Sequence, residues 1–290
     1  MNNKAYPTWF AGGALVLFGV FVLLPNVLGL GFAFTDWNSF SSDVNWVGLD
    51  NFAAIFDPSS TYFTAIENTV LFTLATIALK TVLGLGLAVL LTSGVRRLAY
   101  LYRAIIYLPA VLPMVAVGIV FGSILNPEHG MLNLGLQTVG LGALAQQWLT
   151  DISVALWSVI GVDTWKGVGY IIVILIAGLL VIPRDYYEAA AIDGASSWKA
   201  FRYITLPLLR PVLAVTTVLN LLYGLRVFDI VYVLTSGGPG YATSTLYTTV
   251  FRAFGLGQWG VATALSSVFV IVGLILSFAV LRALRASEEA

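Results

Sequence analysis

Six long apolar segments constrain this chain more than any other feature of its sequence. A helix that crosses a membrane needs about 20 mostly apolar residues, and such segments recur along the whole chain. They cover approximately residues 9–34, 69–91, 104–125, 153–182, 212–234 and 261–284. The chain is 59% hydrophobic and only 10% charged, whereas soluble domains carry about 25% charged residues. The sequence therefore predicts an all-α integral membrane protein with six transmembrane helices in a single membrane domain, residues 1–290.

The fourth of these segments is longer than one straight span requires. Its 30 residues would extend about 45 Å as a helix. Gly167 and Gly169 could bend it, or its first residues could lie outside the bilayer.

Lysine and arginine are distributed unevenly between the two sides that these spans define. One side carries Lys4, Arg96, Arg97, Arg103, Arg184, Lys199, Arg202, Arg210, Arg282 and Arg285, and the other carries only Arg252. Loops rich in Lys and Arg stay in the cytoplasm. We therefore expect a multi-pass plasma-membrane protein with both termini and the stretch 183–211 in the cytoplasm.

Apart from Arg282 at the cytoplasmic end of the last segment, five charged residues fall inside the predicted spans, where a charge costs about 2.5–3.5 kcal/mol or more. Four of them form two pairs spaced three residues apart, Asp163 with Lys166 and Arg226 with Asp229. This spacing places both partners on one helix face, so each pair could neutralise itself near the membrane surface. Alternatively, these faces line a hydrated path. Lys80 has no partner nearby in the sequence, which indicates that it faces the interior of the protein.

The spans also contain amide, hydroxyl and aromatic side chains, at Asn220, Tyr223, Trp165, Tyr170 and Tyr232. Groups of this kind suit a neutral, polyhydroxylated solute, although aromatic residues in spans more often pack or face lipid. The spans hold two acidic residues and no histidine, whereas a proton relay needs several such groups in series. This composition argues against an ion-driven pump.

Enzymatic, metal and nucleic-acid functions find no support in the sequence. It contains none of the short motifs of hydrolases, zinc proteases or phosphate-binding loops, so no catalytic residue is predicted. It has no cysteine and one histidine, His129, and its net charge is zero. We expect no metal, no cofactor in this chain and no nucleic-acid partner, and energy for uphill transport would have to come from a partner protein.

The polar stretch 183–211 separates the fourth and fifth spans and reads PRDYYEAAAIDGASSWKAFRYITLPLLRP. Pro183 suits the first turn of a helix, and Asp185 and Glu188 lie near the positive end of its dipole. Gly194 is a typical residue at the end of a helix. The first half of the stretch is therefore predicted to be a short helix.

A second short helix is expected after this glycine. Ser196 or Ser197 can cap its N-terminus, and Pro207 would close it. Pro211 would then start the fifth span. The sequence thus predicts two short helices at an angle on the cytoplasmic face.

This stretch resembles the EAA loop found in permease subunits of bacterial ATP-binding cassette (ABC) importers. The matching residues are Glu188, Ala189, Ala190, Asp193, Gly194, Ala195, Phe201, Leu206, Pro207 and Pro211. Two further segments, WVGLDNF at 46–52 and the stretch that begins LTSGGPGYAT at 234, resemble the carbohydrate branch of these permeases, of the maltose and glycerol-phosphate type. With the six spans, the resemblance covers most of the chain.

The resemblance implies the fold of a type I ABC importer permease and a set of partners. They are a second, homologous permease subunit, two cytoplasmic ATPase subunits that carry ATP and Mg, and an extracytoplasmic solute-binding protein that delivers a sugar. Glu188 and Gly194 would be the central residues that couple the ATPase to transport. Ala189, Ala190, Asp193 and Ala195 would shape the coupling helix.

In this family the solute contacts come from the spans that flank the loop, and no motif marks them. The candidates by position are Lys166, Gly167, Asn220, Tyr223 and Gly224.

Three alternatives remain open at this point. A glycerol-phosphate permease should offer converging basic groups, which Lys80, Lys166 and Arg226 supply only if they face one cavity. A self-sufficient secondary transporter or channel would move solute without an ATPase. An integral-membrane enzyme is disfavoured because no catalytic cluster is present.

Overall fold

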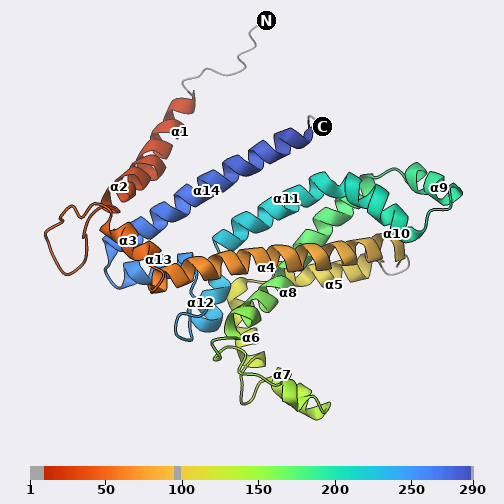
Figure 1. Ribbon diagram of the computed structural model, residues 1–290, viewed down its shortest axis with the longest axis horizontal. Helices are drawn as coiled ribbons and strands as arrows, with labels where there is room; N and C mark the ends of the chain where they lie inside the picture. The colour runs from red at the N-terminus through yellow and green to blue at the C-terminus, as the bar shows by residue number, and fades with distance from the viewer. Residues whose placement is uncertain (1–9, 95–98, 289–290) are drawn as a thin grey trace, which may run out of the picture. The chain divides into compact units, whose positions relative to one another are not determined.

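The computed structural model describes residues 10–94 and 99–288, and this part of the chain is helical, with one isolated β-bridge between Thr35 and Trp46. The basic residues Lys4, Arg96 and Arg97, used above for the orientation, lie outside the described residues. Figure 1 shows the order of the helices along the chain. Their bounds are α1 Phe10–Phe18, η1 Gly19–Leu23, α2 Leu24–Phe32, α3 Asp50–Phe56, α4 Thr61–Val89, η2 Leu90–Gly94, α5 Ala99–Val111, α6 Met114–Ile124, α7 Met131–Thr138, η3 Gly142–Leu144, α8 Ala155–Val181, α9 Arg184–Ile192, α10 Ser197–Ala200, η4 Phe201–Thr205, α11 Leu206–Leu225, α12 Asp229–Thr235, α13 Leu246–Gly255 and α14 Trp259–Glu288.

The described residues form two compact units. The first contains the residues up to Phe63 together with Thr249–Leu274, and the second contains Thr64–Thr248 and the residues from Ile275 onward. The division falls inside α4, α13 and α14.

The first unit begins with the N-terminal span, in which α1, the π-helical turn η1 and α2 follow one another without a break in helical backbone. Within it, Ala11–Phe32 has a mean hydropathy of 2.3 and no buried residue. A helix that is apolar on all sides suits a membrane environment. The length and apolar character of this helix agree with the predicted first span.

The loop after the N-terminal span is organised by Asn51, in the WVGLDNF segment. Its buried side-chain amide donates hydrogen bonds to the carbonyls of Ala33 and Thr35, both at 2.9 Å. The ring of Phe34 stacks on Trp46 at 5.3 Å and contacts Phe52 at 5.2 Å between centroids. The segment therefore closes the loop back onto the end of α2, and two of its aromatic residues contact Phe34, although Trp46 remains 71% exposed.

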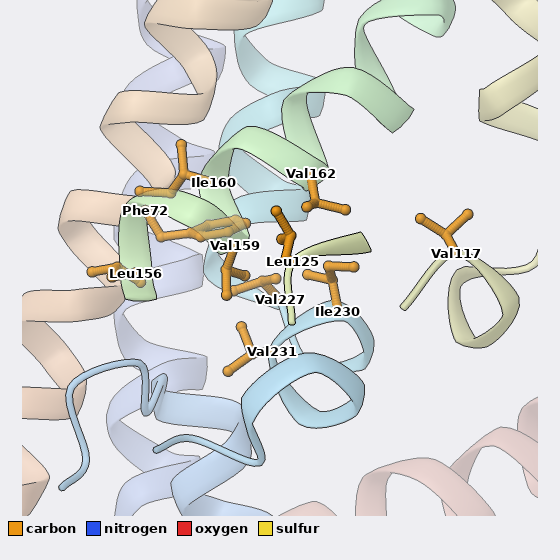
Figure 2. Packing of buried hydrophobic residues seen from close by; sticks show 10 residues of the cluster. All are labelled: Phe72, Val117, Leu125, Leu156, Val159, Ile160, Val162, Val227, Ile230 and Val231. Carbon is orange, nitrogen blue, oxygen red and sulfur yellow. The ribbon is translucent and has the colours of Figure 1, made fainter. Parts of the chain in front are cut away.

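The second unit is built around α8, which contacts α5, α11 and α12. Apolar residues of α8 enter two buried clusters, one near each end of the helix. The first cluster joins α8 to α4, α6 and α12, and Figure 2 shows its members, Phe72, Val117, Leu125, Leu156, Val159, Ile160, Val162, Val227, Ile230 and Val231. The second joins α8 to α4, η2 and α11 through Ala88, Leu91, Ile171, Ile172, Leu175, Ile176 and Leu209. Between the two clusters α8 carries polar residues.

The fourth span is one uninterrupted helix, so Gly167 and Gly169 do not break it. A Cβ atom on Gly169 would lie 3.0 Å from Cα of Tyr107 and would overlap the carbonyl oxygen of Ile106. The glycine therefore allows α5 to cross α8 closely.

The third predicted span is broken into α5 and α6, which meet at an angle of 96°. Pro113 stands at the break as the N-cap of α6, with an extended ψ of 134°. A proline lacks the N–H that would continue the helix and pushes the preceding residue out of helical conformation. The described residues thus contain five helices long and apolar enough to span a membrane, and six when this bent pair counts as one span.

The fifth span differs from the prediction at both of its ends. One continuous helix runs over Ser197–Leu225, and α12 is a separate helix after the break at residues 226–228. Pro207 therefore does not close a short helix, and Pro211 lies inside α11. The π-helical turn η4 comes directly before Pro207, and such a turn changes the hydrogen-bond spacing where a proline interrupts it.

Residues 235–245 form the irregular loop that their glycines predict. The side chains of Thr243, Ser244 and Thr245 are fully buried. The side-chain amide of Asn68 donates to the carbonyls of Tyr241 and Ser244, at 3.2 and 3.0 Å, which attaches the loop to α4. The buried side-chain amide of Asn133, on α7, donates to the carbonyls of Pro127 and Gln146, at 3.1 and 3.0 Å, which holds together the segments before and after this helix.

Candidate functional site

Three polar side chains from three different helices meet in the middle of the second unit. Nζ of Lys80 on α4 lies 2.7 Å from Oδ2 of Asp163 on α8. The hydroxyl of Tyr223 on α11 donates a hydrogen bond of 2.6 Å to Oδ1 of the same carboxylate. Lys80 and Asp163 are 2% and 1% exposed, so this ion pair is removed from solvent and links α4, α8 and α11.

Gly167, one turn after Asp163 on α8, provides the space for the lysine. A Cβ atom at this position would lie 2.7 Å from Nζ and 2.8 Å from Cε of Lys80. The ammonium also lies over the ring of Tyr223, 4.7 Å from its centroid, where a cation is attracted to the ring. The environment of Lys80 is therefore fully built from protein groups.

The predicted pairing of Asp163 with Lys166 is wrong. Although their spacing places them on one face of α8, Asp163 uses both oxygens on Lys80 and Tyr223. Nζ of Lys166 instead donates to the backbone carbonyl of Ala110 at 3.3 Å, in the last turn of α5. Among the described residues Lys166 has no carboxylate within 4.0 Å.

Arg226 and Asp229 also form no ion pair in the described part of the chain. Arg226 ends α11 as its C-cap, and Asp229 begins α12. The chain changes direction between them, so their separation in sequence no longer corresponds to one helix face.

A cavity of about 240 Å³ lies beside this ion pair. It is bounded by α4, α5, α6, α8 and α11, which all belong to the second unit. Its lining residues are Lys80, Tyr107, Ala110, Met114, Asp163, Lys166, Gly167, Tyr170, Leu219, Asn220 and Tyr223.

One polar atom in the cavity wall lacks a partner. Asn220 is 5% exposed, and its side-chain Nδ2 makes no hydrogen bond. Buried amides are normally satisfied, and an unsatisfied one costs about 1–3 kcal/mol. With the ammonium of Lys166 and the rings of Tyr107 and Tyr170 in the same wall, the cavity offers hydrogen-bond donors and aromatic surface to a bound molecule.

Four of the five candidate solute contacts line this cavity, namely Lys166, Gly167, Asn220 and Tyr223. Gly224 does not, because it is buried against α4, where a Cβ atom would lie 2.7 Å from Oγ1 and 3.0 Å from Cα of Thr73. The structure thus gives Gly224 a packing role between α11 and α4.

The contribution of α5 and α6 to the cavity was not predicted from the sequence. Tyr107, Ala110 and Met114 lie on either side of the break between the two helices. The signal that marks this position is the pair Pro109 and Pro113, because prolines inside an apolar segment indicate a kink.

The predicted coupling residues lie on and just after α9, at the end of the helices α8 and α11 (Figure 1). The end of α9 is closed by two backbone hydrogen bonds, from Ala195 N–H to the Ala190 carbonyl at 2.8 Å and from Gly194 N–H to the Ala191 carbonyl at 3.1 Å. This is the Schellman arrangement, which requires a left-handed residue, and Gly194 has φ +72°. The Asp-Gly-Ala sequence therefore forms a defined helix end, as predicted for Gly194.

The side of α9 that carries these residues is open. Glu188, Ala189, Asp193 and Gly194 are exposed, and α9 has no buried residue. Pro183 is the N-cap, one position before the predicted first turn. Ile192 after these alanines is 86% exposed.

Behind this open surface, the segment is attached to the long helix that follows. The hydroxyls of Tyr187 and Thr205 are hydrogen-bonded at 2.9 Å. Ser196 caps α10 by accepting a hydrogen bond of 3.4 Å from Lys199 N–H, as expected for one of the two candidate serines. The predicted second short helix is thus the first part of the helix Ser197–Leu225.

Apolar spans that border a partly open cavity with charged and amide groups in its wall, together with a shaped and exposed helix between two of them, are typical of a membrane transport component. Residues 80–288 match the model of the family described as "Binding-protein-dependent transport system inner membrane component". The chain belongs to this family.

Curated relatives match nearly the whole chain. It is 36% identical over 291 residues to the probable ABC transporter permease protein YurN of Bacillus subtilis, covering 99% of both chains. It is 36% identical over 267 residues to the trehalose/maltose transport system permease protein MalF of Thermococcus litoralis, covering 90% of this chain and 86% of the relative. It is 34% identical over 277 residues to the diacetylchitobiose uptake system permease protein NgcF of Streptomyces coelicolor, covering 92% and 78%.

Among solved structures, the fold is similar to that of a bacterial ABC transporter involved in the import of the acidic polysaccharide alginate. The TM-score is 0.80 at 25% identity, covering 94% of this chain and 93% of the other. The predicted permease fold and the resemblance to ABC importer permeases are therefore confirmed. The chain is a multi-pass membrane transport subunit of this family rather than an enzyme.

Proposed function

We propose that this chain is the permease subunit of an ATP-driven sugar importer and forms half of its translocation path. The observation that carries the proposal is the cavity between the spans, with an unsatisfied amide at Asn220, an ammonium at Lys166 and the rings of Tyr107 and Tyr170. Sugars present hydroxyl oxygens to donors and flat ring faces to aromatic side chains. The names of two relatives, which refer to trehalose/maltose and to diacetylchitobiose, support the same substrate class.

The partner set follows the family. A second, homologous permease completes the path, an extracytoplasmic solute-binding protein delivers the sugar, and two ATPase subunits hold ATP and Mg. The ATPases dock on α9, where Glu188, Ala189, Asp193 and Gly194 are exposed. The distribution of Lys and Arg supports a cytoplasmic position for α9 and for both termini in a bacterial plasma membrane.

Motion at α9 has a direct route to the cavity. The hydrogen bond between Tyr187 and Thr205 attaches α9 to the long helix, and this helix continues to Asn220 and Tyr223 in the cavity wall. From Ser197 to Asn220 it extends about 35 Å. A rigid helix of this length converts tilting of α9 into movement of the cavity wall, which is what alternating access requires.

The glycerol-phosphate alternative needs three basic groups in one cavity, and this arrangement is not found in the described residues. Lys80 and Lys166 line the cavity but Arg226 does not. The charge of Lys80 is already balanced by Asp163. A sugar therefore remains the favoured solute class.

The coupling role is tested with Glu188→Lys in the reconstituted importer. Reversing this charge on the exposed face of α9 should lower ATP-dependent sugar uptake at least tenfold, because the ATPase could no longer dock. Gly194→Pro should act similarly, since proline cannot adopt φ +72°. Uptake and co-purification of the ATPase are measured together.

Glu67→Lys provides the matched control, because Glu67 is also exposed but lies on α4, far from α9 in the chain. It should leave ATPase association unchanged. Unchanged uptake and unchanged association in Glu188→Lys would refute the coupling role. Sugar flux through the purified chain alone in liposomes would show instead that it is a self-sufficient transporter.

A further inference from the structure

The charges that line the cavity do not cancel. The one acidic residue in the wall is Asp163, and its two oxygens accept from Lys80 at 2.7 Å and from Tyr223 at 2.6 Å. Lys80 and Asp163 thus neutralise each other. Lys166 is left as the uncompensated charge among the residues of the wall.

The surroundings of Lys166 satisfy it only in part. Its ammonium has three N–H donors, and one bond is formed, to the carbonyl of Ala110 at 3.3 Å. That carbonyl lies in the last turn of α5, where the helix dipole supplies about half of a negative charge. A carbonyl and a partial charge do not replace a carboxylate, so donors and positive charge remain for an occupant of the cavity.

Asn220 adds a second, independent requirement. Its Nδ2 is buried in the wall without an acceptor, and it comes from α11 whereas Lys166 comes from α8. Two helices therefore present unsatisfied donors to the same cavity. The complementary group is an oxygen acceptor that carries negative charge, since a neutral hydroxyl would satisfy the amide but not the ammonium.

We propose that the cavity binds an acidic sugar, and that Lys166 and Asn220 select its carboxylate. This inference rests on the proposed sugar-import function and narrows its substrate class to saccharides that contain a uronic acid. It also differs from the neutral solute that the amide, hydroxyl and aromatic side chains of the spans indicate in the sequence. At about 240 Å³ the cavity is slightly below the roughly 300–1,000 Å³ common for ligand sites, which suits one sugar unit at a time.

The test uses the assembled importer, with its partner permease, ATPase and binding protein, in proteoliposomes. The probes are digalacturonate and its neutral counterpart, the dimethyl ester, each measured for ATP-dependent uptake and for binding to the permease complex. The unaltered importer should bind digalacturonate at least tenfold more tightly than the ester. Lys166→Gln should remove this preference by weakening digalacturonate binding about tenfold, with little effect on the ester.

Two further variants separate recognition from folding. Lys166→Arg keeps the charge and should keep the preference. Asn220→Asp introduces a negative charge into the wall without changing Lys166, and should weaken digalacturonate binding more than tenfold. Arg226→Gln removes one positive charge outside the cavity wall and should change neither probe.

The outcomes distinguish the two proposals. ATP-driven uptake of the ester that equals or exceeds uptake of digalacturonate, unchanged in Lys166→Gln, would overturn the acidic-sugar inference and leave the sugar-import function intact. ATP-driven uptake of neither probe nor of unrelated neutral disaccharides would overturn the import function and the inference together. If Lys166→Gln loses the preference for digalacturonate in ATP-driven uptake and Lys166→Arg keeps it, both the sugar-import function and the acidic-sugar inference are established.

Discussion

The N-terminal span and α8 are nearly equal in hydropathy but differ in burial and in the charged side chains that they carry. Their mean hydropathies are 2.3 and 2.0. None of the N-terminal span is buried within the chain, whereas 33% of the corresponding window of α8 is buried. The described residues of the N-terminal span include no charged side chain, while α8 carries Asp163 and Lys166.

The comparison shows what a polar group in a membrane span requires. Asp163 and Lys80 are tolerated because each is enclosed by protein and paired with the other, as intramembrane charges normally are. The glycines of the two helices also differ in how closely other side chains approach them. Gly167 makes room for Lys80, while a Cβ atom added to Gly13 of α1 would meet no other atom within 4 Å. Hydropathy alone therefore does not separate a span that carries function from one that faces its surroundings.

Breaking the ion pair of α8 with Lys80 should lower the free energy of unfolding the most. Lys80→Met leaves the carboxylate of Asp163 buried without its cation, and removal of one partner of a buried pair costs about 3–5 kcal/mol. The free energy of unfolding of the purified full chain, measured by denaturant titration in lipid–detergent micelles, should fall by that amount. The double variant Lys80→Met/Asp163→Leu should recover most of the loss, because no uncompensated charge remains.

The control for this prediction is Arg226→Gln, which removes an exposed positive charge and should change the free energy of unfolding by less than about 0.5 kcal/mol. A double variant that is no more stable than Lys80→Met would contradict the explanation. In that case the lysine would stabilise α8 through packing or through its contact with Tyr223 rather than through charge.

Truncating an apolar side chain should also affect the two spans differently. Leu175 on α8 is fully buried, whereas Leu17 on α1 is 60% exposed. Leu175→Ala should cost about 2–5 kcal/mol through lost contacts and a residual cavity, and Leu17→Ala less than about 0.5 kcal/mol. The same titration measures both. Equal losses would show that the N-terminal span is packed against protein in the purified state.

The features that depend on local pattern could be predicted from the sequence. Apolar length predicts the spans, and the Asp-Gly-Ala sequence predicts the end of α9 at Gly194. A glycine in this position is a local requirement, since its φ of +72° is unfavourable for other residues.

The features that depend on contacts distant in sequence could not. Asp163 has an apparent partner three residues away, but its true partner, Lys80, is 83 residues away. Which cation it binds depends on how α4 crosses α8, and nothing in the local pattern specifies this. Four cavity residues could be proposed because they lie on the polar parts of the fourth and fifth spans. Tyr107 and Ala110 could not, because the break after α5 that brings them to the cavity was not expected.

The prolines of two spans show the same limit of local sequence pattern. Pro109 lies inside α5 and Pro113 ends the break, while Pro207 and Pro211 leave their helix uninterrupted. All four lie in or beside apolar sequence, so residue type does not distinguish them. The π-helical turn before Pro207 and the packing of α11 against α8 decide which helix continues.

The smallest effects are predicted for the addition of one methyl group at each of two helical glycines. Gly224→Ala on α11 would place Cβ 3.0 Å from the backbone Cα of Thr73, which cannot move as a side-chain end can, so α11 and α4 must separate. Such overpacking costs about 1–3 kcal/mol. Gly13→Ala on α1 meets no atom within 4 Å and should instead stabilise the helix by about 0.5–1 kcal/mol. The two variants should therefore shift the free energy of unfolding in opposite directions. If both are stabilising, α11 packs less closely on α4 than this structure shows, and Asn220 and Tyr223 on the same helix would be free to change position relative to Lys80.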